Sequence, residues 1–287
     1  MKGIILAAGN GTRLFPVSEH VSKILLPVYD KPMVYYPLST LMQAGIRDIM
    51  IITNESNLDL FERLLGDGSQ FGVRIEYAVQ HVQRGIADAF IIAEDFIGND
   101  DVCLVLGDNI FHHEGLPQIL RRAASDNAEA TVFAYPVKNP EMFGVVEFDA
   151  AGNAVSLEEK PSKPRSNNAV VGLYFYKCNV CSMVKDLKPS LRGELEITDL
   201  NRKYLEKGLL KVVKLEKDVL WIDTGTFDSL LDAGMLVRDV QKRLGRIISC
   251  PEHIALCSGF VSDENIRAWT ETKKMNEYYE FVRDLRL

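Results

Sequence analysis

A turn near the start of the chain combines two glycines with an arginine, a combination suited to binding an anion. It reads Gly9-Asn10-Gly11-Thr12-Arg13 and follows an apolar run. Glycines let the backbone turn sharply toward a phosphate, whose oxygens the amides can bind, and an arginine can add a bidentate contact. The turn lacks the third glycine of a dinucleotide-binding motif and the Gly-Lys-Ser/Thr of a P-loop. A phosphate-binding turn and a tight turn without a ligand therefore both stay open.

A lysine inside an apolar segment offers a second positive group. Lys23 directly precedes Ile24-Leu25-Leu26-Pro27. Burying an unpaired charge is costly, so a lysine in such surroundings needs an anionic partner, and a bound phosphate is one. The alternative is an ordinary solvated lysine.

Two aspartates each follow an apolar run that reads as a strand. Asp108 follows Val105-Leu106-Gly107, and Asp223 follows Trp221-Ile222 and precedes a glycine turn. Mg²⁺ is commonly held by one or two carboxylates together with substrate phosphates. The pair predicts a magnesium site, against the alternatives of a turn residue at Asp108 and a helix N-cap at Asp223.

Further along, Glu158-Glu159-Lys160-Pro161 closes an expected hairpin. A carboxylate next to a lysine can bind a sugar hydroxyl and a phosphate, although a solvated charged turn would have the same composition. The adjacent His112 and His113 point in different directions, which favours a surface or interface role over a metal site. No nucleophile elbow, zinc-binding helix or kinase catalytic loop is present. Phosphoryl or nucleotidyl transfer fits this absence, because a phosphate nucleophile needs positioning and charge neutralisation rather than a base.

The first half of the chain alternates short β-branched runs with helical patterns, which indicates an α/β fold with a Rossmann-like, mostly parallel sheet and helices on both faces. Ligands bind beyond the carboxyl ends of the strands in such sheets. The expected strands are Gly3–Ala8, Asp48–Thr53, Arg74–Val79, Val102–Leu106 and Ala130–Tyr135, and the expected helices are Tyr36–Gly45, Leu58–Leu65, Ala87–Phe96 and Leu116–Ser125.

The middle of the chain predicts an antiparallel section. Gly144–Phe148 and Ala154–Glu158 flank a turn and form a hairpin, and Ala169–Tyr176 is another strand. The remaining expected elements are the helices Cys181–Leu187 and Ile197–Lys207 and the strands Leu210–Leu215 and Val219–Ile222. From Phe227 onward the pattern is mostly helical.

Composition limits the classes of function. The 287 residues are 47% hydrophobic and 25% charged, and 33 basic against 40 acidic residues give a net charge of −7. This balance argues against sequence-independent binding to nucleic acid or an anionic membrane. No apolar run approaches the ~20 residues of a membrane helix, and no signal peptide is evident, so we expect a cytoplasmic protein. The five cysteines, with Cys178 and Cys181 as a Cys-x-x-Cys, are expected to be structural or redox-inert.

Taken in order, these motifs resemble the sugar-1-phosphate nucleotidyltransferases, and among them the glucose-1-phosphate thymidylyltransferases. The resemblance covers nearly all of the chain. Its carriers are Lys2–Arg13, Val21–Met33, Tyr35–Met42, Leu64–Gln70, Leu106–Phe111, Gly144–Phe148, Leu157–Pro161, Arg192–Asp199 and Trp221–Thr226.

The resemblance implies a Mg²⁺-dependent reaction of dTTP with α-D-glucose 1-phosphate, giving dTDP-glucose and pyrophosphate, the first step of dTDP-deoxysugar biosynthesis. The sugar phosphate would attack the α-phosphorus in line. The same chemistry with UTP or another sugar 1-phosphate is an alternative, since the methyl group that separates thymine from uracil is worth only about 1–3 kcal/mol. A non-catalytic regulator that binds a nucleotide sugar is the alternative of a different class.

The resemblance also implies roles for individual residues. In catalysis it implicates Arg13, Lys23, Asp108, Lys160 and Asp223, with Asp108 and Asp223 as the Mg²⁺ ligands. The implied nucleotide-binding residues are Gly9, Gly11, Thr12, Gln80 and Gly85, and the implied sugar-binding residues are Gly144, Glu159, Lys160 and Val170.

Family habit further implies a homotetramer with a second, regulatory nucleotide-sugar site at a subunit interface. Residues 1–226 would form the α/β core with an inserted sugar-binding section, and residues 227–287 a helical region for oligomer contacts and regulation. The chain departs from the family pattern at Phe143, Val171, His81–Gly85, His112-His113 and Leu256–Ser258. The last segment lacks a usual arginine, a bidentate phosphate partner. We therefore hypothesise that feedback by dTDP-rhamnose is weakened or that another dTDP-sugar is the effector.

Overall fold

The computed structural model describes residues 1–126 and 128–286. At its centre four parallel strands lie in the order β6-β1-β4-β5. Leu6 at the end of β1 is level with Ile52 of β4 and Leu106 of β6, so the carboxyl ends of the strands meet at one edge. The bounds are Lys2–Leu6 for β1, Asp48–Thr53 for β4, Arg74–Val79 for β5 and Val102–Leu106 for β6.

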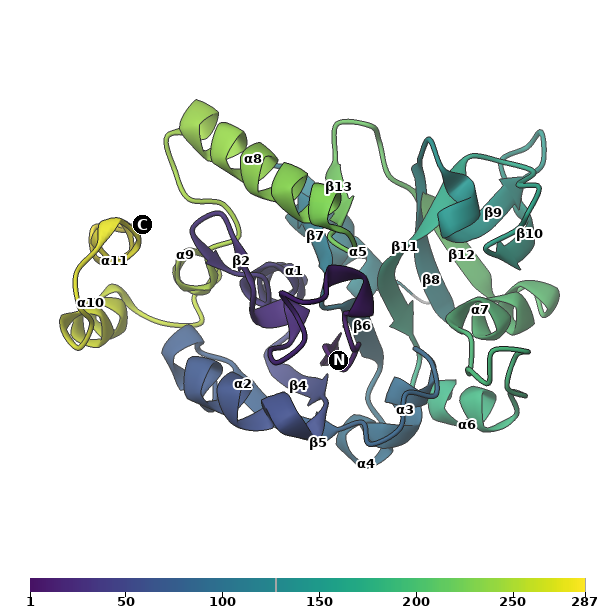
Figure 1. Cartoon of the computed structure of the whole chain (residues 1–287), viewed down its shortest axis with the longest axis horizontal. Helices are drawn as coiled ribbons and strands as arrows, with labels where there is room; N and C mark the ends of the chain where they lie inside the picture. Colours follow the sequence, from purple (N-terminus) through teal and green to yellow (C-terminus); the bar gives the residue numbers. More distant parts are fainter. Residues whose placement is uncertain (127, 287) are drawn as a thin grey trace.

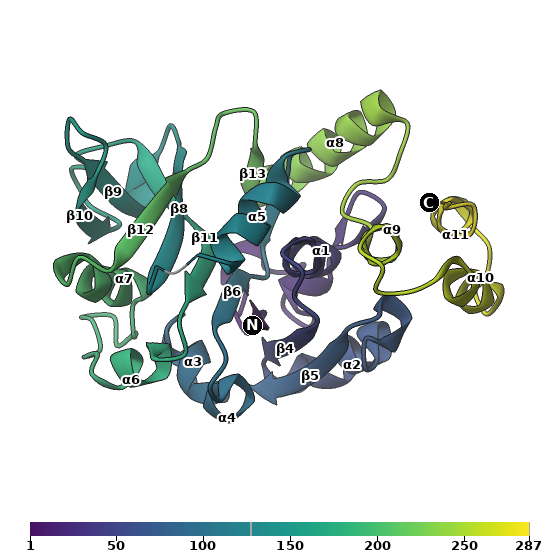
Figure 2. The same cartoon turned by 180° about the vertical axis from the view of Figure 1, so that it is seen from behind.

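Alternate residues of these strands pack into two apolar clusters, one on each face of the sheet. Figures 1 and 2 show the helices that lie on the two sides of the sheet. Ile5 and Ile51 belong to the first cluster, while Ile4 and Ile52 belong to the second. The first cluster includes residues of α1 (Tyr35–Gln43), α2 (Leu58–Leu65), α5 (Leu116–Ala124), α8 (Phe227–Leu244) and α9 (Pro251–Cys257). The second includes residues of α3 (Asp88–Ile92), α4 (Glu94–Ile97), α6 (Val180–Lys185) and α7 (Ile197–Glu206). The predicted α/β fold with helices on both faces is confirmed.

The helix expected over Ala87–Phe96 is in fact two short helices, α3 and α4. They meet at Ala93, whose backbone angles of φ −93° and ψ 11° lie outside the α-helical range. The buried apolar residues of both helices belong to the second cluster, so the apolar spacing correctly predicted the side that packs against the sheet.

The predicted antiparallel section extends the sheet beyond β6. Strand β11 pairs antiparallel with β6 through its carboxyl half and with β9 through Ala169, so the sheet divides along β11. In the described residues the whole sheet has nine strands. The added strands are β8 (Ala130–Pro136), β9 (Gly144–Phe148), β10 (Ala154–Glu159), β11 (Asn168–Tyr176) and β12 (Leu210–Lys214).

A two-stranded antiparallel ribbon crosses the carboxyl edge of the parallel strands. It consists of β7 (Asn109–His112) and β13 (Leu220–Asp223). The second strand was predicted, whereas β7 was not. It follows β6 after only Gly107 and Asp108, and a turn residue was one of the alternatives for Asp108. The other short elements are β2 (Pro27–Val28), β3 (Lys31–Pro32), η1 (Thr12–Leu14), η2 (Lys23–Leu25), η3 (Glu55–Asn57), η4 (Ser69–Phe71) and η5 (Pro140–Met142).

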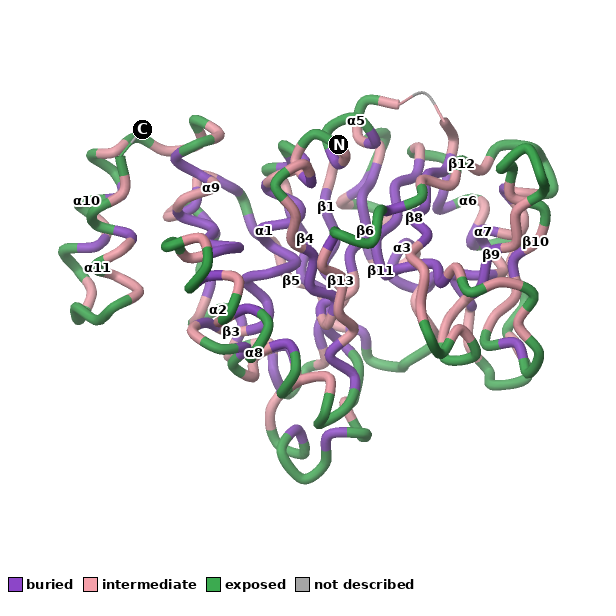
Figure 3. Tube along the Cα trace, turned by 90° about the horizontal axis from the view of Figure 1, so that it is seen from above, coloured by how far each residue is buried: buried purple, intermediate pink, exposed green. Residues whose placement is uncertain are grey.

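The chain ends in helices, as predicted. Helix α8 starts with a capping box between Thr226 and Ser229. Helices α10 (Asp263–Glu271) and α11 (Glu277–Arg283) lie at one end of the molecule and contribute to a small third cluster (Figures 1 and 3). The division at residues 226 and 227 stays a prediction. None of the helices that the structure describes is long and apolar enough to span a membrane.

Candidate active site

Pairing between β7 and β13 brings the two predicted metal carboxylates together. Asp223, the last residue of β13, is level with Asn109, the first of β7, and Asp108 precedes Asn109. Thr224 fixes the junction, because its backbone N–H and its Oγ1 both donate to the carbonyl oxygen of Asp108 at 3.0 Å. Residues more than a hundred positions apart in sequence thus converge at the edge where ligands are expected.

The two carboxyl groups differ in their readiness to ionise. Burial and the charge of Asp108 raise the pKa of Asp223 to about 6, against the opposing effect of Lys23 and Arg13. Burial acts in the same direction on Asp108. There, however, the charge of Lys23 and the hydrogen bonds from Lys23 and Asn109 outweigh burial, and the pKa is lowered. Asp108 is therefore ionised, and Asp223 takes up a proton easily unless a further cation arrives.

Lys23 forms an ion pair with Asp108 through Nζ and Oδ2. Their side chains are 11% and 15% exposed, respectively. Lys23 begins η2, whose N-cap Ser22 accepts a hydrogen bond from the backbone N–H of Ile24 at 3.3 Å. The sequence left open whether Lys23 is solvated or has an anionic partner, and in the described structure its partner is the carboxylate of Asp108. Its contact with a phosphate stays a prediction.

Arg13 lies near Asp223, and its charge opposes the rise in the pKa of that carboxyl. It sits in η1, whose N-cap Gly11 has a left-handed φ of 63° and accepts a hydrogen bond from Ser18 Oγ at 2.7 Å. A Cβ atom on Gly225 would lie 2.6 Å from a terminal nitrogen of Arg13 and 2.7 Å from Asp223 Oδ1. The absence of a side chain at Gly225 therefore lets the guanidinium come close to the carboxylate.

Asn109 holds this group of side chains in place, a role that the sequence did not reveal. It is 1% exposed, and its Nδ2 donates to Asp108 Oδ1 at 3.0 Å. Its Oδ1 accepts from Trp221 Nε1 at 2.7 Å and from the backbone N–H of Gly172 at 3.0 Å. Asn109 thus links Asp108 to β13 and to β11, the strand along which the sheet divides.

The predicted sugar-binding residues form a neighbouring group around Gly144. A Cβ atom there would lie 2.8 Å from Thr198 Oγ1, 3.3 Å from Glu159 Oε2 and 4.0 Å from Val170 Cβ. Thr198 donates a hydrogen bond to Glu159 Oε2 at 2.5 Å. Thr198 lies inside a motif that carried the resemblance, but it was not predicted as a site residue.

Positively charged side chains flank Glu159. Lys160 Nζ lies 3.7 Å and Arg192 NH2 3.6 Å from Glu159 Oε1. Lys160 has an unusual positive φ of 43°, and its backbone N–H donates to the carbonyl oxygen of Phe143 at 3.0 Å. Arg192 is held by Glu196, to which it donates three hydrogen bonds at 2.9 to 3.2 Å.

Tyr174 on β11 connects the two groups. Burial raises the pKa of its phenol, and the charges of Glu159, Asp108 and Asp223 raise it further. The Tyr174 side chain is therefore within electrostatic reach of Glu159 and of the two aspartates.

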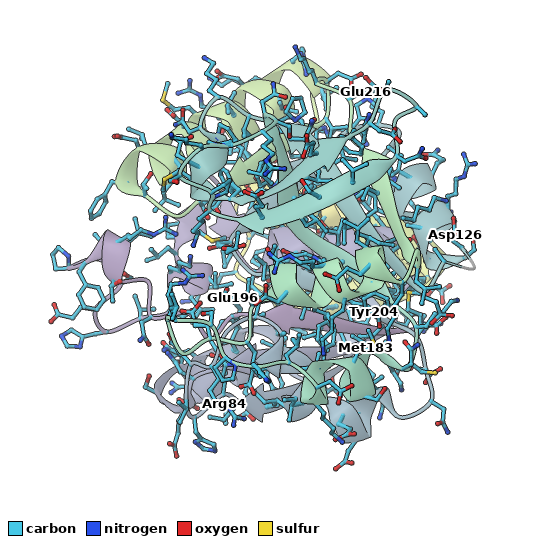
Figure 4. All side chains as sticks on the ribbon, turned by 90° about the vertical axis from the view of Figure 1, so that its right-hand side faces the viewer. Arg84, Asp126, Met183, Glu196, Tyr204 and Glu216 are labelled. Atoms are coloured by element: carbon cyan, nitrogen blue, oxygen red, sulfur yellow. The ribbon has the colours of Figure 1, made fainter. Side chains whose placement is uncertain are left out.

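The predicted nucleotide loop follows β5. Gln80 is 6% exposed, and its backbone N–H donates to the carbonyl oxygen of Thr53 at 2.8 Å. Gly85 has a φ of 98°, and a Cβ atom there would lie 2.5 Å from the carbonyl oxygen of Leu195. The backbone N–H of Leu195 donates to the carbonyl oxygen of Arg84 at 2.6 Å, so the loop is joined to the segment that carries Arg192 and Glu196 (Figure 4).

The same loop also reaches the glycine-rich turn. Gln83 Nε2 donates to the carbonyl oxygen of Ala8 at 2.6 Å and to Asn10 Oδ1 at 2.7 Å. Gly9 and Thr12 in this turn are exposed, and a Cβ atom on Gly9 would meet nothing within 4 Å. The nucleotide loop thus contacts both the glycine-rich turn and the segment that carries Arg192 and Glu196.

Comparison with known proteins identifies the family. Residues 2–240 match the family model described as nucleotidyl transferase. The chain belongs to this family. It is 56% identical over 282 residues to a glucose-1-phosphate thymidylyltransferase of Neisseria meningitidis serogroup A, and the match covers 98% of both chains. It is also 56% identical over 285 residues to a glucose-1-phosphate thymidylyltransferase of Mycolicibacterium smegmatis, and that match covers 99% of both chains. The resemblance predicted from the sequence is confirmed.

Two solved structures resemble this chain, and the first of them agrees with its membership of the nucleotidyl transferase family. A candidate glucose-1-phosphate thymidylyltransferase from Bacillus anthracis is 44% identical with a TM-score of 0.77, covering 83% of this chain and 96% of that one. A UDP-glucose pyrophosphorylase complexed with UDP-glucose is 22% identical with a TM-score of 0.74, covering 83% and 98%. The second likeness supports the fold alone.

The donor set at the paired aspartates suits Mg²⁺. Within residues 1–126 and 128–286, no group of three or more His, Cys, Asp or Glu side chains could hold a metal ion by itself. Mg²⁺ does not need such a cage, because it usually keeps waters and binds one or two carboxylates together with substrate phosphates. The mutual repulsion of Asp108 and Asp223, expressed in the raised pKa of Asp223, is what a shared cation would relieve.

Proposed function

We propose that the protein transfers a thymidylyl group from dTTP to α-D-glucose 1-phosphate, releasing pyrophosphate and forming dTDP-glucose. This reaction is the entry step to dTDP-deoxysugars. The observation that carries the proposal is the convergence of Lys23, Asp108 and Asp223, with Arg13 against Asp223, beside the group around Glu159. Relatives at 56% identity over nearly the full chain bear the name of this activity.

In the proposed reaction, an oxygen of the sugar phosphate forms the new bond to the α-phosphorus of dTTP. The bond from that phosphorus to the bridging oxygen of the leaving pyrophosphate breaks, and its electron pair leaves with the pyrophosphate. No proton has to be removed, because the nucleophile is already an anion at neutral pH. The protein therefore acts by holding the two substrates in line and by neutralising charge.

Each charged residue has a part in this proposal. Lys160 holds the sugar phosphate, and Glu159 accepts hydrogen bonds from sugar hydroxyls. Arg13 and Lys23 face the triphosphate, and Lys23 also keeps Asp108 ionised through their ion pair. Mg²⁺ held by Asp108 and Asp223 supplies charge neutralisation on the phosphate oxygens.

We further propose that the protein assembles as a homotetramer. Helix α8 carries exposed apolar side chains at Phe227, Leu231 and Met235, which are 49%, 65% and 46% exposed. Their spacing of four residues places them along one face of the helix. An apolar stripe of this kind marks a contact surface, and a second copy of the chain would cover it.

A regulatory nucleotide-sugar site is proposed at a cavity of about 220 Å³ between β7, α5 and α9. Its lining includes His112, His113, Arg121, Arg246, His253 and Cys257. Two arginines suit a diphosphate, yet Cys257 stands in the segment where the family usually has another. We therefore propose that dTDP-rhamnose inhibits only weakly or that another dTDP-sugar is the effector. Tight inhibition by dTDP-rhamnose would contradict this.

The proposed activity is tested by pyrophosphate release with Mg²⁺, crossing dTTP, UTP, CTP, ATP and GTP against glucose 1-phosphate and other sugar 1-phosphates. We expect the fastest release with dTTP and glucose 1-phosphate. A preference for UTP or another sugar phosphate would mean that the reaction type is correct but that the assigned substrate is wrong. Silence across the whole panel would favour a non-catalytic binder.

A further inference from the structure

Asp88 occupies a buried position beside Gln80, which the family resemblance implies in nucleotide binding and which we propose reads the edge of the base. Asp88 is the first residue of α3 and is 1% exposed. Its Oδ2 accepts a hydrogen bond from Gln80 Nε2 at 3.0 Å, and its Oδ1 lies 2.8 Å from Arg84 NH2 in an ion pair. Arg84, Asp88 and Gln80 therefore form a chain of contacts from the surface of the loop to the end of β5 (Figure 4 labels Arg84).

The charge of Asp88 restricts the orientation of the Gln80 side chain. An ionised carboxylate only accepts hydrogen bonds, whereas a glutamine amide has one accepting and one donating end. Gln80 must therefore present its NH2 group to Asp88, because turning the amide over would set two oxygens against each other. In the described residues, Gln80 Oε1 takes part in no hydrogen bond, so it is left free to accept one from a ligand.

The fixed orientation matches one class of pyrimidine. Thymine and uracil carry a donor at N3 beside a carbonyl oxygen, which Gln80 Oε1 and the second hydrogen of Nε2 can meet as a pair. Cytosine carries an acceptor at N3 beside an amino group, so each of its atoms would meet a like atom of Gln80. A site built to hydrogen-bond one pattern rejects the other because its polar groups are left unpaired.

We infer that Asp88, held by Arg84, is a positioning residue that locks the amide of Gln80 and thereby selects pyrimidines with a proton on N3 over cytosine. This inference rests on the proposed function and deepens it. It assigns a role to Arg84, which lies in the segment His81–Gly85 where this chain departs from the family pattern, and to Asp88, which follows that segment.

The test compares kcat/KM for dTTP, UTP and dCTP, with glucose 1-phosphate, in the wild type and Asp88→Asn. An asparagine can donate as well as accept, so Gln80 is free to turn over. We expect the preference for dTTP over dCTP to fall by about 10- to 100-fold, mainly through KM. Equal losses for dTTP and dCTP would mean that Asp88 is only structural and would overturn the inference.

Two further variants keep the test decisive. Asp59→Asn is the matched control, because Asp59 and Arg63 form an ion pair with the same four-residue spacing at exposed positions of α2. The preference ratio of this variant should stay within about twofold of the wild type. If Asp88→Asn does not fold, Arg84→Met replaces it, since Arg84 is 55% exposed at the loop surface. Loss of the counter-charge should lower the preference in the same direction, and an unchanged preference would overturn the inference.

Failure of the proposed function would be recognised separately, as a wild type that turns over none of the nucleotides with any sugar phosphate. The same comparison would then be made by calorimetric binding of dTDP and dCDP. A preference for dTDP that Asp88→Asn diminishes would support the role of Asp88 even in a non-catalytic binder. A preference that Asp88→Asn leaves intact would refute it.

Discussion

Asp108 raises the pKa of Asp223. The two carboxyl groups are held side by side by the β7–β13 ribbon. Burial first, and then the charge of Asp108, move the pKa of Asp223 to about 6. Without a further cation the site is therefore unfavourable for two ionised carboxylates. The repulsion between the carboxylates of Asp108 and Asp223 should therefore affect both the stability of the fold and the binding of a cation.

Replacing Asp223 by asparagine should stabilise the metal-free protein at neutral pH while lowering activity by at least about 100-fold. A carboxyl whose pKa is raised on folding, here from 3.8 to about 6, stabilises the fold below the lower value, and this contribution is lost as pH rises through the upper value. The gain of Asp223→Asn should therefore be absent near pH 4 and reach about 1–3 kcal/mol near pH 7.5. Thermal unfolding at both pH values measures this gain in stability, and the variant Asp232→Asn, at an exposed position, is the control. A gain that is equal at both would contradict the account.

Mg²⁺ should raise the unfolding temperature more at about pH 8 than at about pH 5. At the lower pH a proton occupies Asp223 and competes with the cation, because the pKa of this group is about 6. Chelation should also abolish pyrophosphate release, and adding Mg²⁺ should restore it. Asp223→Asn should lose the pH dependence of the thermal shift. A shift that is independent of pH would show that the cation binds elsewhere.

Gly144→Ala should weaken binding of the sugar phosphate. The added methyl group would lie 2.8 Å from Thr198 Oγ1 and 3.3 Å from Glu159 Oε2, so it would disturb the hydrogen bond between them. We expect KM for glucose 1-phosphate to rise about 10-fold, with a smaller change in KM for dTTP. Gly234→Ala is the control, because its methyl group would meet its nearest atom at an ordinary 3.7 Å. Adding Thr198→Ala to Gly144→Ala should relieve the clash and lower KM for glucose 1-phosphate again. A double variant whose KM is as high as that of Gly144→Ala alone would show that the clash with Thr198 is not the cause.

Gly225→Ala should damage catalysis more than stability. Its methyl group would lie 2.6 Å from Arg13 NH2 and 2.7 Å from Asp223 Oδ1, and the arginine can move away because Arg13 is exposed. We expect kcat to fall by about 100-fold while the unfolding temperature changes by a few degrees at most. Steady-state kinetics beside thermal unfolding separates the two effects. Near-normal kcat would mean that the position of Arg13 is unimportant.

Local sequence patterns predicted most of the fold, because most strands and helices show the spacing of apolar residues that is typical of their own type. Arg74–Val79 and Leu58–Leu65 have the predicted bounds. Strand β7 escaped prediction because a four-residue strand directly after a glycine and an aspartate looks like a turn. Its partner β13 is more than a hundred residues away, and only that pairing makes it a strand.

The site was predicted as a set of motifs, but the contacts between them were not. Asp108 and Asp223 were predicted as partners from their similar positions at strand ends. Asn109 and Thr198 were missed because nothing local distinguishes a buried hydrogen-bonding residue from a turn or helix residue. Their roles come from contacts with Trp221, Gly172 and Glu159, which only the folded chain brings close.

The proposed reaction and the roles of Asp108 and Asp223 can be tested together by ³¹P NMR of dTTP and glucose 1-phosphate with Mg²⁺, in the presence of the wild type, Asp108→Asn or Asp223→Asn. With the wild type we expect equal amounts of dTDP-glucose and pyrophosphate, and with either variant a rate lower by at least about 100-fold. Product formation at an undiminished rate in the two variants would contradict the assignment of the site, and no dTDP-glucose with the wild type would contradict the proposed function itself.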